Sequence, residues 1–343
     1  MKKVHILKFI SVTLSILAAA SFAGCSKVST RANPNEVVVY AYDSFLSEWG
    51  PGPELKKRFE EKTGLTLTFI EGEDAVSLLS KAILEKDDPV ADILIGLDNN
   101  SSYKALEADL LQEYKPKDAD RLIPESLVKE IGGKWKITPY DYSHFAIIYN
   151  TKSSVPAPKS LQDLTNPAYE KSLILMNPRT STPGLGFAAW TVAIFGDGYL
   201  DYWKALKPNI LAMTPGWSSG WGMFEKGEAP LVISYTTSPA ATYEYNGATD
   251  YEALVFDEGH PMQVEGAAIL KKAKNLEGAK KFMDFFISDE AQSVIPLTQW
   301  MYPANKNVSL PESYKKAAAS PKKTVSADPK KVEEAVEKIM ELK

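Results

Sequence analysis

Apolar and polar positions alternate in a strand-then-helix pattern from residue 36 onward. The apolar run 37–42 predicts a buried strand. In 51–62, Leu55 and Phe59 lie one turn apart, which predicts a helix that Gly64 ends. The segment 65–70 then alternates as Leu-Thr-Leu-Thr-Phe, the rhythm of a strand with one buried face. Strands that alternate with helices in this way are typical of a mostly parallel sheet covered by helices.

Two extended segments interrupt this alternation. The segment 137–150 is long and aromatic, which indicates a crossover between two lobes, and 263–270 indicates a crossover back. A body of more than 300 residues also favours two lobes over a single core. We therefore predict an α/β protein whose two lobes are joined by two extended crossovers and separated by a ligand cleft. The other predicted elements are strands at 91–97, 173–176 and 231–235 and helices at 75–86, 183–195, 199–206, 217–226, 290–295 and 332–340.

The N-terminus is typical of an exported protein. Lys2, Lys3 and Lys8 precede the uncharged stretch 9–24, which is shorter than the roughly 20 residues of a spanning helix. The stretch ends in Phe-Ala-Gly before Cys25 and resembles a bacterial lipobox, which implies lipidation at Cys25; an ordinary signal peptide is the alternative. Loss of this leader makes the remaining chain more acidic than its net charge of −5, which argues against nucleic-acid binding.

The predicted organisation has five parts. Residues 1–24 form the signal peptide and 25–35 a polar tether. Residues 36–140 plus 260–303 form the first lobe, 141–259 form the second, and 304–343 form a C-terminal helical segment.

Residues suited to catalysis are scarce. Cys25 is the only cysteine, so neither an intrachain disulfide nor a cysteine nucleophile is available in the folded body. One of the three histidines, His5, lies in the leader, and no serine lies in a Gly-x-Ser-x-Gly elbow. Metal-ligand spacings and glycine-rich phosphate loops are also missing from the sequence. We therefore expect a binding protein without a cofactor or a metal, not an enzyme.

Polar candidates for ligand binding lie where helices begin or strands end. Ser181 and Thr182 begin a predicted helix, whose free N–H groups favour an anion or a polar oxygen. Asp74 begins another helix and can accept hydrogen bonds or balance a cation. Three hydroxyl residues, 236–238, follow a strand and are expected to face the cleft. Ordinary capping and turn formation are the alternatives for all of these residues.

Aromatic candidates also lie at element junctions. Trp217 follows Pro-Gly at a helix start, and Trp300 lies between a helix and a proline. Tyr42 and Tyr235 end predicted strands. A tryptophan is most often part of a core, but several rings at junctions favour a pocket that holds a flat, cationic ligand.

Several of these segments together resemble the periplasmic thiamine-binding proteins of bacterial thiamine ABC importers. The similarity runs from about 37 to 302 and is densest at Tyr-Asp-Ser-Phe (42–45), Trp-Gly-Pro-Gly-Pro (49–53), Gly-Leu-Asp-Asn-Asn (96–100), 178–186, 234–240 and Trp-Met-Tyr-Pro (300–303). The resemblance implies the type II binding-protein fold, a monomer, and delivery of thiamine or its phosphates to a permease driven by a separate ATPase. The ligand contacts that it implies fall on Asp74, Ala75, Ser181, Thr182, Trp217, Tyr235, Thr236, Thr237 and Ser238, with Tyr42 and Trp300 lining the same cleft.

This family assignment gives a specific binding hypothesis. The rings enclose the two heterocycles of thiamine, Asp74 meets the aminopyrimidine or the cation, and Ser181 and Thr182 take the hydroxyl or a phosphate. Two positions depart from the family: Ala75 stands where a relative has glycine, and Trp221 replaces a tyrosine.

Other ligands and activities remain as alternatives. One alternative is a ferric-iron binder of the same fold, whose site resembles an adjacent pair of tyrosines. Here Tyr235 is followed by a threonine, so that pair is missing. A thiamine-degrading transferase of related fold would need a cleft cysteine. Sugar and polyamine binders are further alternatives.

Overall fold

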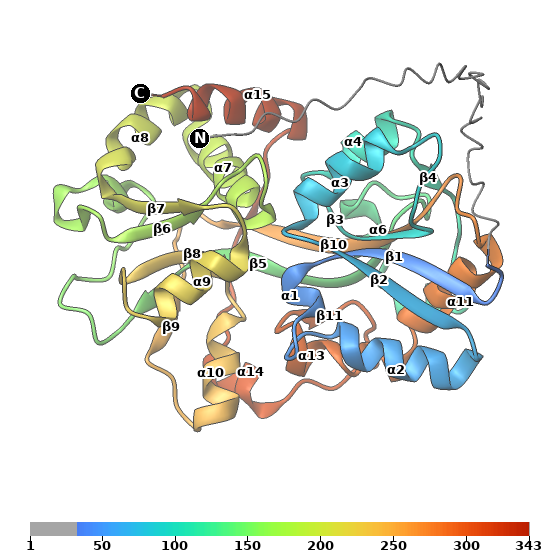
Figure 1. The fold of residues 1–343 in the computed structure, drawn as a ribbon. Coiled ribbons are helices and arrows are strands. Elements are labelled where there is room, and N and C mark those ends of the chain that lie inside the picture. The colour runs from blue at the N-terminus through green and yellow to red at the C-terminus, as the bar shows by residue number, and fades with distance from the viewer. Residues whose placement is uncertain (1–32, 343) are drawn as a thin grey trace, which may run out of the picture. The chain divides into compact units, whose positions relative to one another are not determined.

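The computed structural model describes residues 33–342 and shows two α/β lobes (Figure 1). The predicted signal peptide, the lipidation at Cys25 and most of the tether lie outside the described residues. Among the described residues, no helix combines the length and the apolar composition that crossing a membrane requires.

The first lobe is built mainly from the N-terminal part of the chain. Its strands are β1 (Glu36–Tyr42), β2 (Thr66–Gly72), β3 (Ile93–Asp98) and β4 (Leu111–Gln112), and its helices are α1 (Asp43–Leu46), α2 (Gly52–Thr63), α3 (Ala75–Leu84), α4 (Ser102–Glu107), α5 (Ala119–Leu122) and α6 (Glu125–Glu130). Elements that follow the second lobe return to it, namely α11 (Leu276–Phe286), α12 (Asp289–Gln292), α13 (Ile295–Thr298) and β11 (Tyr302–Pro303).

The second lobe lies between the two crossover strands, β5 (Thr138–Asn150) and β10 (His260–Leu270). Its strands are β6 (Leu173–Met176), β7 (Ile210–Thr214), β8 (Leu231–Tyr235) and β9 (Tyr251–Leu254), and its helices are α7 (Thr182–Phe195), α8 (Tyr199–Leu206), α9 (Trp217–Glu225) and α10 (Ser238–Asn246), with short 3₁₀-helices η1 (Gln162–Thr165), η2 (Pro167–Tyr169), η3 (Gly196–Gly198) and η4 (Lys207–Asn209). The chain ends with α14 (Glu312–Ala317), β12 (Thr324–Val325) and α15 (Pro329–Met340).

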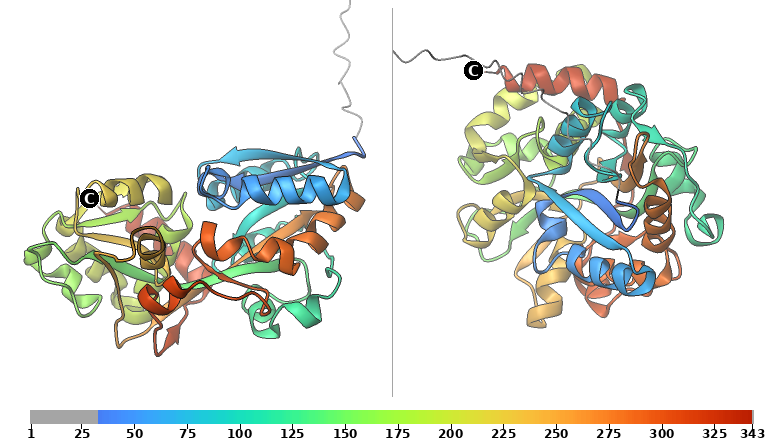
Figure 2. Two further views of the ribbon diagram at one scale, coloured as in Figure 1. Left: turned by 90° about the horizontal axis from the view of Figure 1, so that it is seen from below. Right: turned by 45° about the vertical axis from the view of Figure 1, so that its right-hand side comes forward.

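One continuous ladder of strands links the lobes in the order β2-β1-β3-β10-β5-β8-β6-β7. The pairs β1–β2, β1–β3, β6–β8 and β6–β7 are parallel, as the strand-helix alternation predicts. The crossover strands β5 and β10 pair antiparallel with each other and with their outer neighbours β8 and β3. Helices cover both faces of the first-lobe sheet, with α3 on one side and α2 and α11 on the other (Figures 1 and 2).

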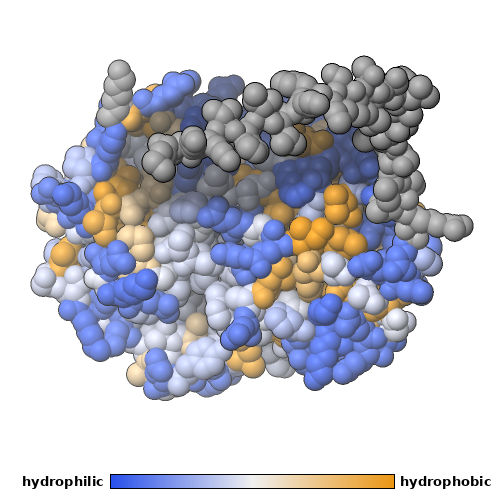
Figure 3. Space-filling view, viewed as in Figure 1, coloured by the Kyte–Doolittle hydropathy of each residue, from blue (hydrophilic) through white to orange (hydrophobic). Residues whose placement is uncertain are grey.

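Each lobe has its own hydrophobic core. The first core comprises buried residues of 37–140 and 264–304, and the second comprises those of 145–256 and 332–339. Helix α15 therefore packs on the second lobe through Val332, Val336 and Ile339. Between the cores the sheet is continuous, so β5 and β10 are the natural place for a hinge. On the face seen in Figure 3, hydrophilic residues cover much of the surface, and hydrophobic residues form patches on its left side and right of its centre.

Most predicted elements are confirmed with small shifts at their ends. The single helix expected at 290–295 is wrong, because Pro296 begins a new helix and the chain forms the separate short helices α12 and α13. Several helices had no predicted counterpart, among them α4, α5, α6, α10, α11 and α14. Helix α11 carries Gly278 in its first turn, and glycine lowers the helix propensity of this segment. The helix nevertheless needs a glycine there, because an added Cβ would lie 2.7 Å from Val37 Cγ2.

Candidate functional site

A cavity of about 750 Å³ lies between the lobes and receives residues from both. A third of the residues that line it are aromatic. The rings are Tyr42, Trp49, Trp217, Trp221, Tyr235, Tyr245, Tyr251 and Trp300. A volume of this size is typical of a small-molecule site.

Helix α9 supplies the most ordered part of the aromatic wall. Trp217 and Trp221 lie one turn apart and stack with centroids 5.4 Å apart and an interplanar angle of 13°. Trp49 meets the Trp217 ring edge-on at 6.0 Å. The indole Nε1 of Trp217 donates to Ser234 Oγ at 2.9 Å, which holds the ring in one orientation. The three rings therefore support one another, and the hydrogen bond from Trp217 orients them toward the cavity.

Asp74 joins the two lobes at one end of the cavity. It caps α3 by accepting a hydrogen bond from the Ala75 backbone N–H at 2.7 Å. From the second lobe it accepts the backbone N–H groups of Thr182, at the start of α7 (3.0 Å), and Trp217, at the start of α9 (3.4 Å). Three helix N-termini thus point at one carboxylate, which helix dipoles favour.

The electrostatics of Asp74 are a balance between burial and these donors. Burial raises the pKa of Asp74 to about 6, and the hydrogen bonds from Thr182, Ser181 and the other donors only partly oppose that rise. The Ser181 hydroxyl is close enough to Asp74 to favour the ionised form of the carboxyl group. Neither this hydroxyl nor that of Thr182 has a hydrogen-bond partner of good geometry. Of these two hydroxyl groups, only that of Thr182 belongs to a residue that lines the cavity, where it is free for a further polar group.

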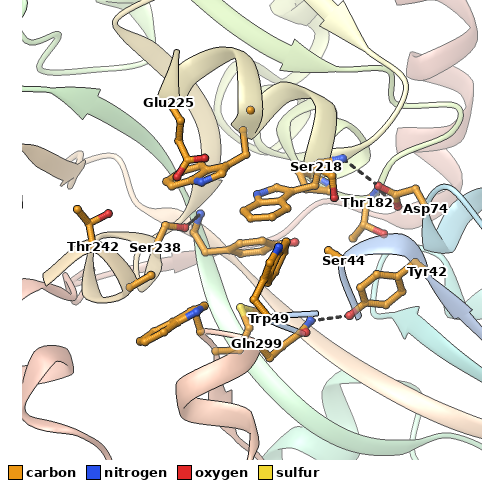
Figure 4. Close-up of a pocket in the computed structure, with 18 of the residues that line it drawn as sticks. Tyr42, Ser44, Trp49, Asp74, Thr182, Ser218, Glu225, Ser238, Thr242 and Gln299 are labelled. Carbon is orange, nitrogen blue, oxygen red and sulfur yellow. Dashed lines mark hydrogen bonds between the residues drawn. The ribbon is translucent and has the colours of Figure 1, made fainter. Parts of the chain in front are cut away.

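The other end of the cavity carries Glu225 and Thr242 (Figure 4). Tyr42 lies on the Asp74 side of the cavity (Figure 4), where its hydroxyl accepts a hydrogen bond from Gln299 Nε2 at 2.5 Å and pairs with Tyr140 Oη at 2.9 Å. The acids that line the cavity are Asp74, Glu225 and Glu265. Among the described residues that line it there is no lysine, arginine or histidine. An aromatic cavity with acids and without bases is suited to a flat cation.

Trp300 reaches the cavity through an unusual backbone conformation. Its φ is +58°, a region that favours glycine, and its ring packs between Tyr245 (5.7 Å) and Tyr314 (6.4 Å). Such a conformation at a non-glycine residue costs about 1 kcal/mol and is most common at functional sites. The sequence contains no sign of it.

The structure brings eight of the predicted contacts to the cavity wall: Tyr42, Asp74, Ala75, Thr182, Trp217, Tyr235, Ser238 and Trp300. The expectation that the whole hydroxyl run faces the cleft is wrong for Thr236 and Thr237, which are fully buried and lie near the Ser143 hydroxyl at 3.2 and 3.1 Å. Ser181 is also fully buried, behind Thr182. The cause is local, because α10 begins at Ser238 and turns the two threonines toward β5.

The structure also changes how the polar residues are grouped. Asp74, Ser181 and Thr182 lie together at one end of the cavity. This arrangement disagrees with the form of the binding hypothesis in which Asp74 meets the aminopyrimidine, and it agrees with the form in which Asp74 meets the cation, because the cationic ring carries the hydroxyethyl arm. Residues not singled out as contacts line the wall as well, among them Trp49, Tyr245, Gln263, Glu265 and Gln299. The Trp217–Trp221 spacing of four could have indicated a shared helix face, whereas Gln263 and Glu265 lie in an unremarkable apolar strand and gave no signal.

The fold and this interlobe cavity define a periplasmic binding protein of type II. A sequence model of the bacterial extracellular solute-binding protein family matches residues 88–323. The chain belongs to that family.

Its relatives within the family have named ligands. The chain is 36% identical to the thiamine-binding periplasmic protein of Brucella melitensis over 320 residues, covering 93% of this chain and 94% of that one. It is 39% identical to the Escherichia coli thiamine-binding periplasmic protein over 283 residues, covering 82% and 84%. A solved periplasmic thiamin binding protein superposes with a TM-score of 0.81 at 36% identity, covering 89% and 95%. A ferric binding protein from Campylobacter jejuni shares the fold, with a TM-score of 0.70 at 21% identity.

Proposed function

We propose that this chain captures thiamine in the interlobe cavity and delivers it to the permease of an ABC importer. The observation that carries the proposal is the composition of the cavity wall, in which stacked rings and three acids occur without a basic residue among the described lining residues. Thiamine combines two flat rings, one of them permanently cationic, with a hydroxyethyl arm. The named ligand of the relatives supports the same choice.

The Asp74 end of the cavity suits the hydroxyethyl arm of thiamine. A hydroxyl group can donate to the Asp74 carboxylate and accept from the free hydroxyl of Thr182, since both residues line the cavity. The phosphates of thiamine could use the same helix starts. However, the Asp74 carboxylate already holds those N–H groups, so a phosphate must displace it or bind when it is protonated. We therefore propose thiamine as the main ligand and its phosphates as weaker ones.

The ferric-iron alternative gains no support from the site. Tyr235 lines the cavity, but the neighbouring Thr236 is buried. Within the described part of the chain, no group of three or more His, Cys, Asp and Glu side chains is arranged to hold a metal ion.

Delivery requires that the protein be exported and reach the membrane. The leader and the predicted lipidation at Cys25 would place it in the periplasm or at the cell surface, attached by its lipid. In this proposal the protein makes and breaks no bond in its ligand. The closed lobes would dock as a monomer on the permease, and a separate ATPase would power transport.

Calorimetric titration of the purified protein with thiamine, thiamine monophosphate and thiamine diphosphate tests the proposal. We expect one site per chain and an order of affinity in which thiamine leads. A protein that gives no binding heat with any of the three, and no rise in melting temperature when they are added, would contradict it.

A further inference from the structure

The floor of the cavity is formed where the two crossover strands pair. Gln263 and Glu265 on β10 are two residues apart and therefore project from the same face of the sheet. Directly opposite them on β5 lie Ser143 and Asp141, respectively. Both Gln263 and Glu265 line the cavity.

The side-chain amide of Gln263 has no partner within the described residues. Its side chain is fully buried, yet neither Nε2 nor Oε1 makes a hydrogen bond. In contrast, Gln292, which is equally buried, donates to the Phe286 carbonyl at 3.1 Å and accepts from the Asn305 N–H at 3.1 Å. Buried polar groups are nearly always hydrogen-bonded, and an unmade bond is unfavourable. A free donor and a free acceptor at the wall of a cavity therefore point to a ligand that pairs with them.

Glu265 lies among other acidic and phenolic groups. Asp98 on β3 and Asp141 on β5 stand opposite it in register, and the hydroxyl groups of Tyr42 and Tyr140 act on it by hydrogen bonding. Burial raises the pKa of Glu265 to about 7, and burial together with the charge of Glu265 raises that of Asp141 well above its usual range. Neither oxygen of Asp141 has a hydrogen-bond partner, so the two carboxyl groups can bond to each other only by sharing a proton. A proton held on Asp141 leaves Glu265 as an acceptor toward the cavity.

We propose that Gln263 and Glu265 form a polar floor that recognises a ring edge carrying an amino group beside a ring nitrogen. The proposal rests on the proposed function, because the aminopyrimidine of thiamine has this edge. The Glu265 carboxylate accepts a hydrogen bond from the amino group, and Gln263 Nε2 donates to the adjacent ring nitrogen. The floor thereby takes the recognition role that the sequence had given to Asp74, which lies at the hydroxyethyl end instead.

Two thiamine analogues separate this edge from the rest of the ligand. Oxythiamine replaces the amino group with an oxo group, so it presents an acceptor to Glu265 and an N–H to Gln263. Pyrithiamine keeps the aminopyrimidine and replaces the thiazolium with a pyridinium. We expect the wild-type protein to bind thiamine and pyrithiamine at least about tenfold more tightly than oxythiamine, because a site built for one hydrogen-bond pattern rejects the reverse.

The variants Gln263→Met and Glu265→Gln test the assignment by calorimetric titration with all three compounds. Both should lower the preference for thiamine over oxythiamine to within about threefold, and both should weaken thiamine and pyrithiamine by equal factors. Gln162→Met is the matched control, because this exposed glutamine of η1 is bonded to Thr165 and does not line the cavity. It should leave the thiamine-to-oxythiamine ratio at its wild-type value. Gln263→Met removes an unpaired amide, so its melting temperature should not fall below that of the wild type.

Two results would overturn the assignment, and they are distinguishable. If the wild type binds thiamine but Gln263→Met and Glu265→Gln keep its full preference over oxythiamine, the floor assignment alone is wrong. If the wild type binds none of the three compounds, the proposed function is wrong and the floor assignment falls with it.

Discussion

The change Trp217→Ala should weaken thiamine binding by about 2 kcal/mol, roughly thirtyfold, while the fold is kept. The ring of Trp217 is part of the stacked pair on α9, and its indole is fixed by Ser234. Removing it deletes one aromatic contact to the ligand, worth about 0.5–1.5 kcal/mol, and a cation–π contact, worth about 1 kcal/mol or more when water is excluded. The remaining Trp221 ring can recover part of this by shifting toward the gap, so the lower end of the sum is expected.

Calorimetric titration and thermal melting of three variants would measure this effect. Trp217→Phe keeps a ring but loses the bond to Ser234, and it should bind about fivefold more weakly than the wild type. Trp135→Ala is the matched control, because Trp135 is also half-buried and packs against the first core but does not line the cavity. It should leave the affinity within about twofold. A normally folded Trp217→Ala protein with wild-type affinity would refute the aromatic wall as the binding surface.

Three further results are expected. The affinity for thiamine should rise from pH 5 to pH 8, because a cation favours ionised Glu265, and proton release on binding, seen as a buffer-dependent heat, would check this. Because the pKa of Glu265 is raised from 4.5 to about 7, the contribution of this residue to the stability of the unliganded fold is highest below about pH 4.5, and roughly 3 kcal/mol of it is lost as the pH rises from about 4.5 to about 7. Asp74→Asn should weaken thiamine binding by about tenfold, because an amide N–H would face the Trp217 N–H. The affinity for the phosphates should improve relative to that for thiamine, because a fixed negative charge would be gone; unchanged relative affinities in the same titrations would contradict this. Glu333→Gln breaks the pair with Lys104 and should favour the open lobes by less than about 1 kcal/mol. Small-angle scattering should then show a larger radius of gyration at low salt only. Glu337→Gln, which breaks a pair within the second lobe, should leave the radius of gyration unchanged.

The last of these predictions depends on a bridge between the lobes that α15 makes. Its apolar face packs on the second core, while Glu333 pairs with Lys104 Nζ at 2.8 Å and Lys330 pairs with Glu107 at 2.6 Å, both on α4 of the first lobe. Figure 1 shows the start of α15 lying toward α4. These pairs are half-exposed, so each contributes little and salt weakens it.

The sequence predicts the strand-helix alternation well, because 37–42 is a short apolar run, 65–70 alternates, and the long apolar segment 183–195 follows the helix-start signal of Ser181, Thr182 and Pro183. It locates the cavity through residues at element junctions, such as Trp217 and Tyr235. The other residues of the cavity wall, such as Trp49 and Gln263, could be assigned to it only from the three-dimensional structure.

The missed features depend on contacts between distant parts of the chain. Gln263 and Glu265 belong to the site only because β10 pairs with β5, and nothing in their local sequence separates them from a core strand. Asp74 is correctly placed as a helix cap, but its bonds to Thr182 and Trp217 arise from the meeting of two lobes. Trp300 likewise combines a positive φ with ring contacts to Tyr245 and Tyr314, which are distant in the sequence.

The most direct measurement of the central claim is a crystal structure of the protein grown with thiamine. The account predicts both heterocycles between the Trp217 wall and the Gln263–Glu265 floor, with the hydroxyethyl arm toward Asp74. Density for thiamine outside this cavity, or an empty cavity in crystals grown at saturating thiamine, would contradict it.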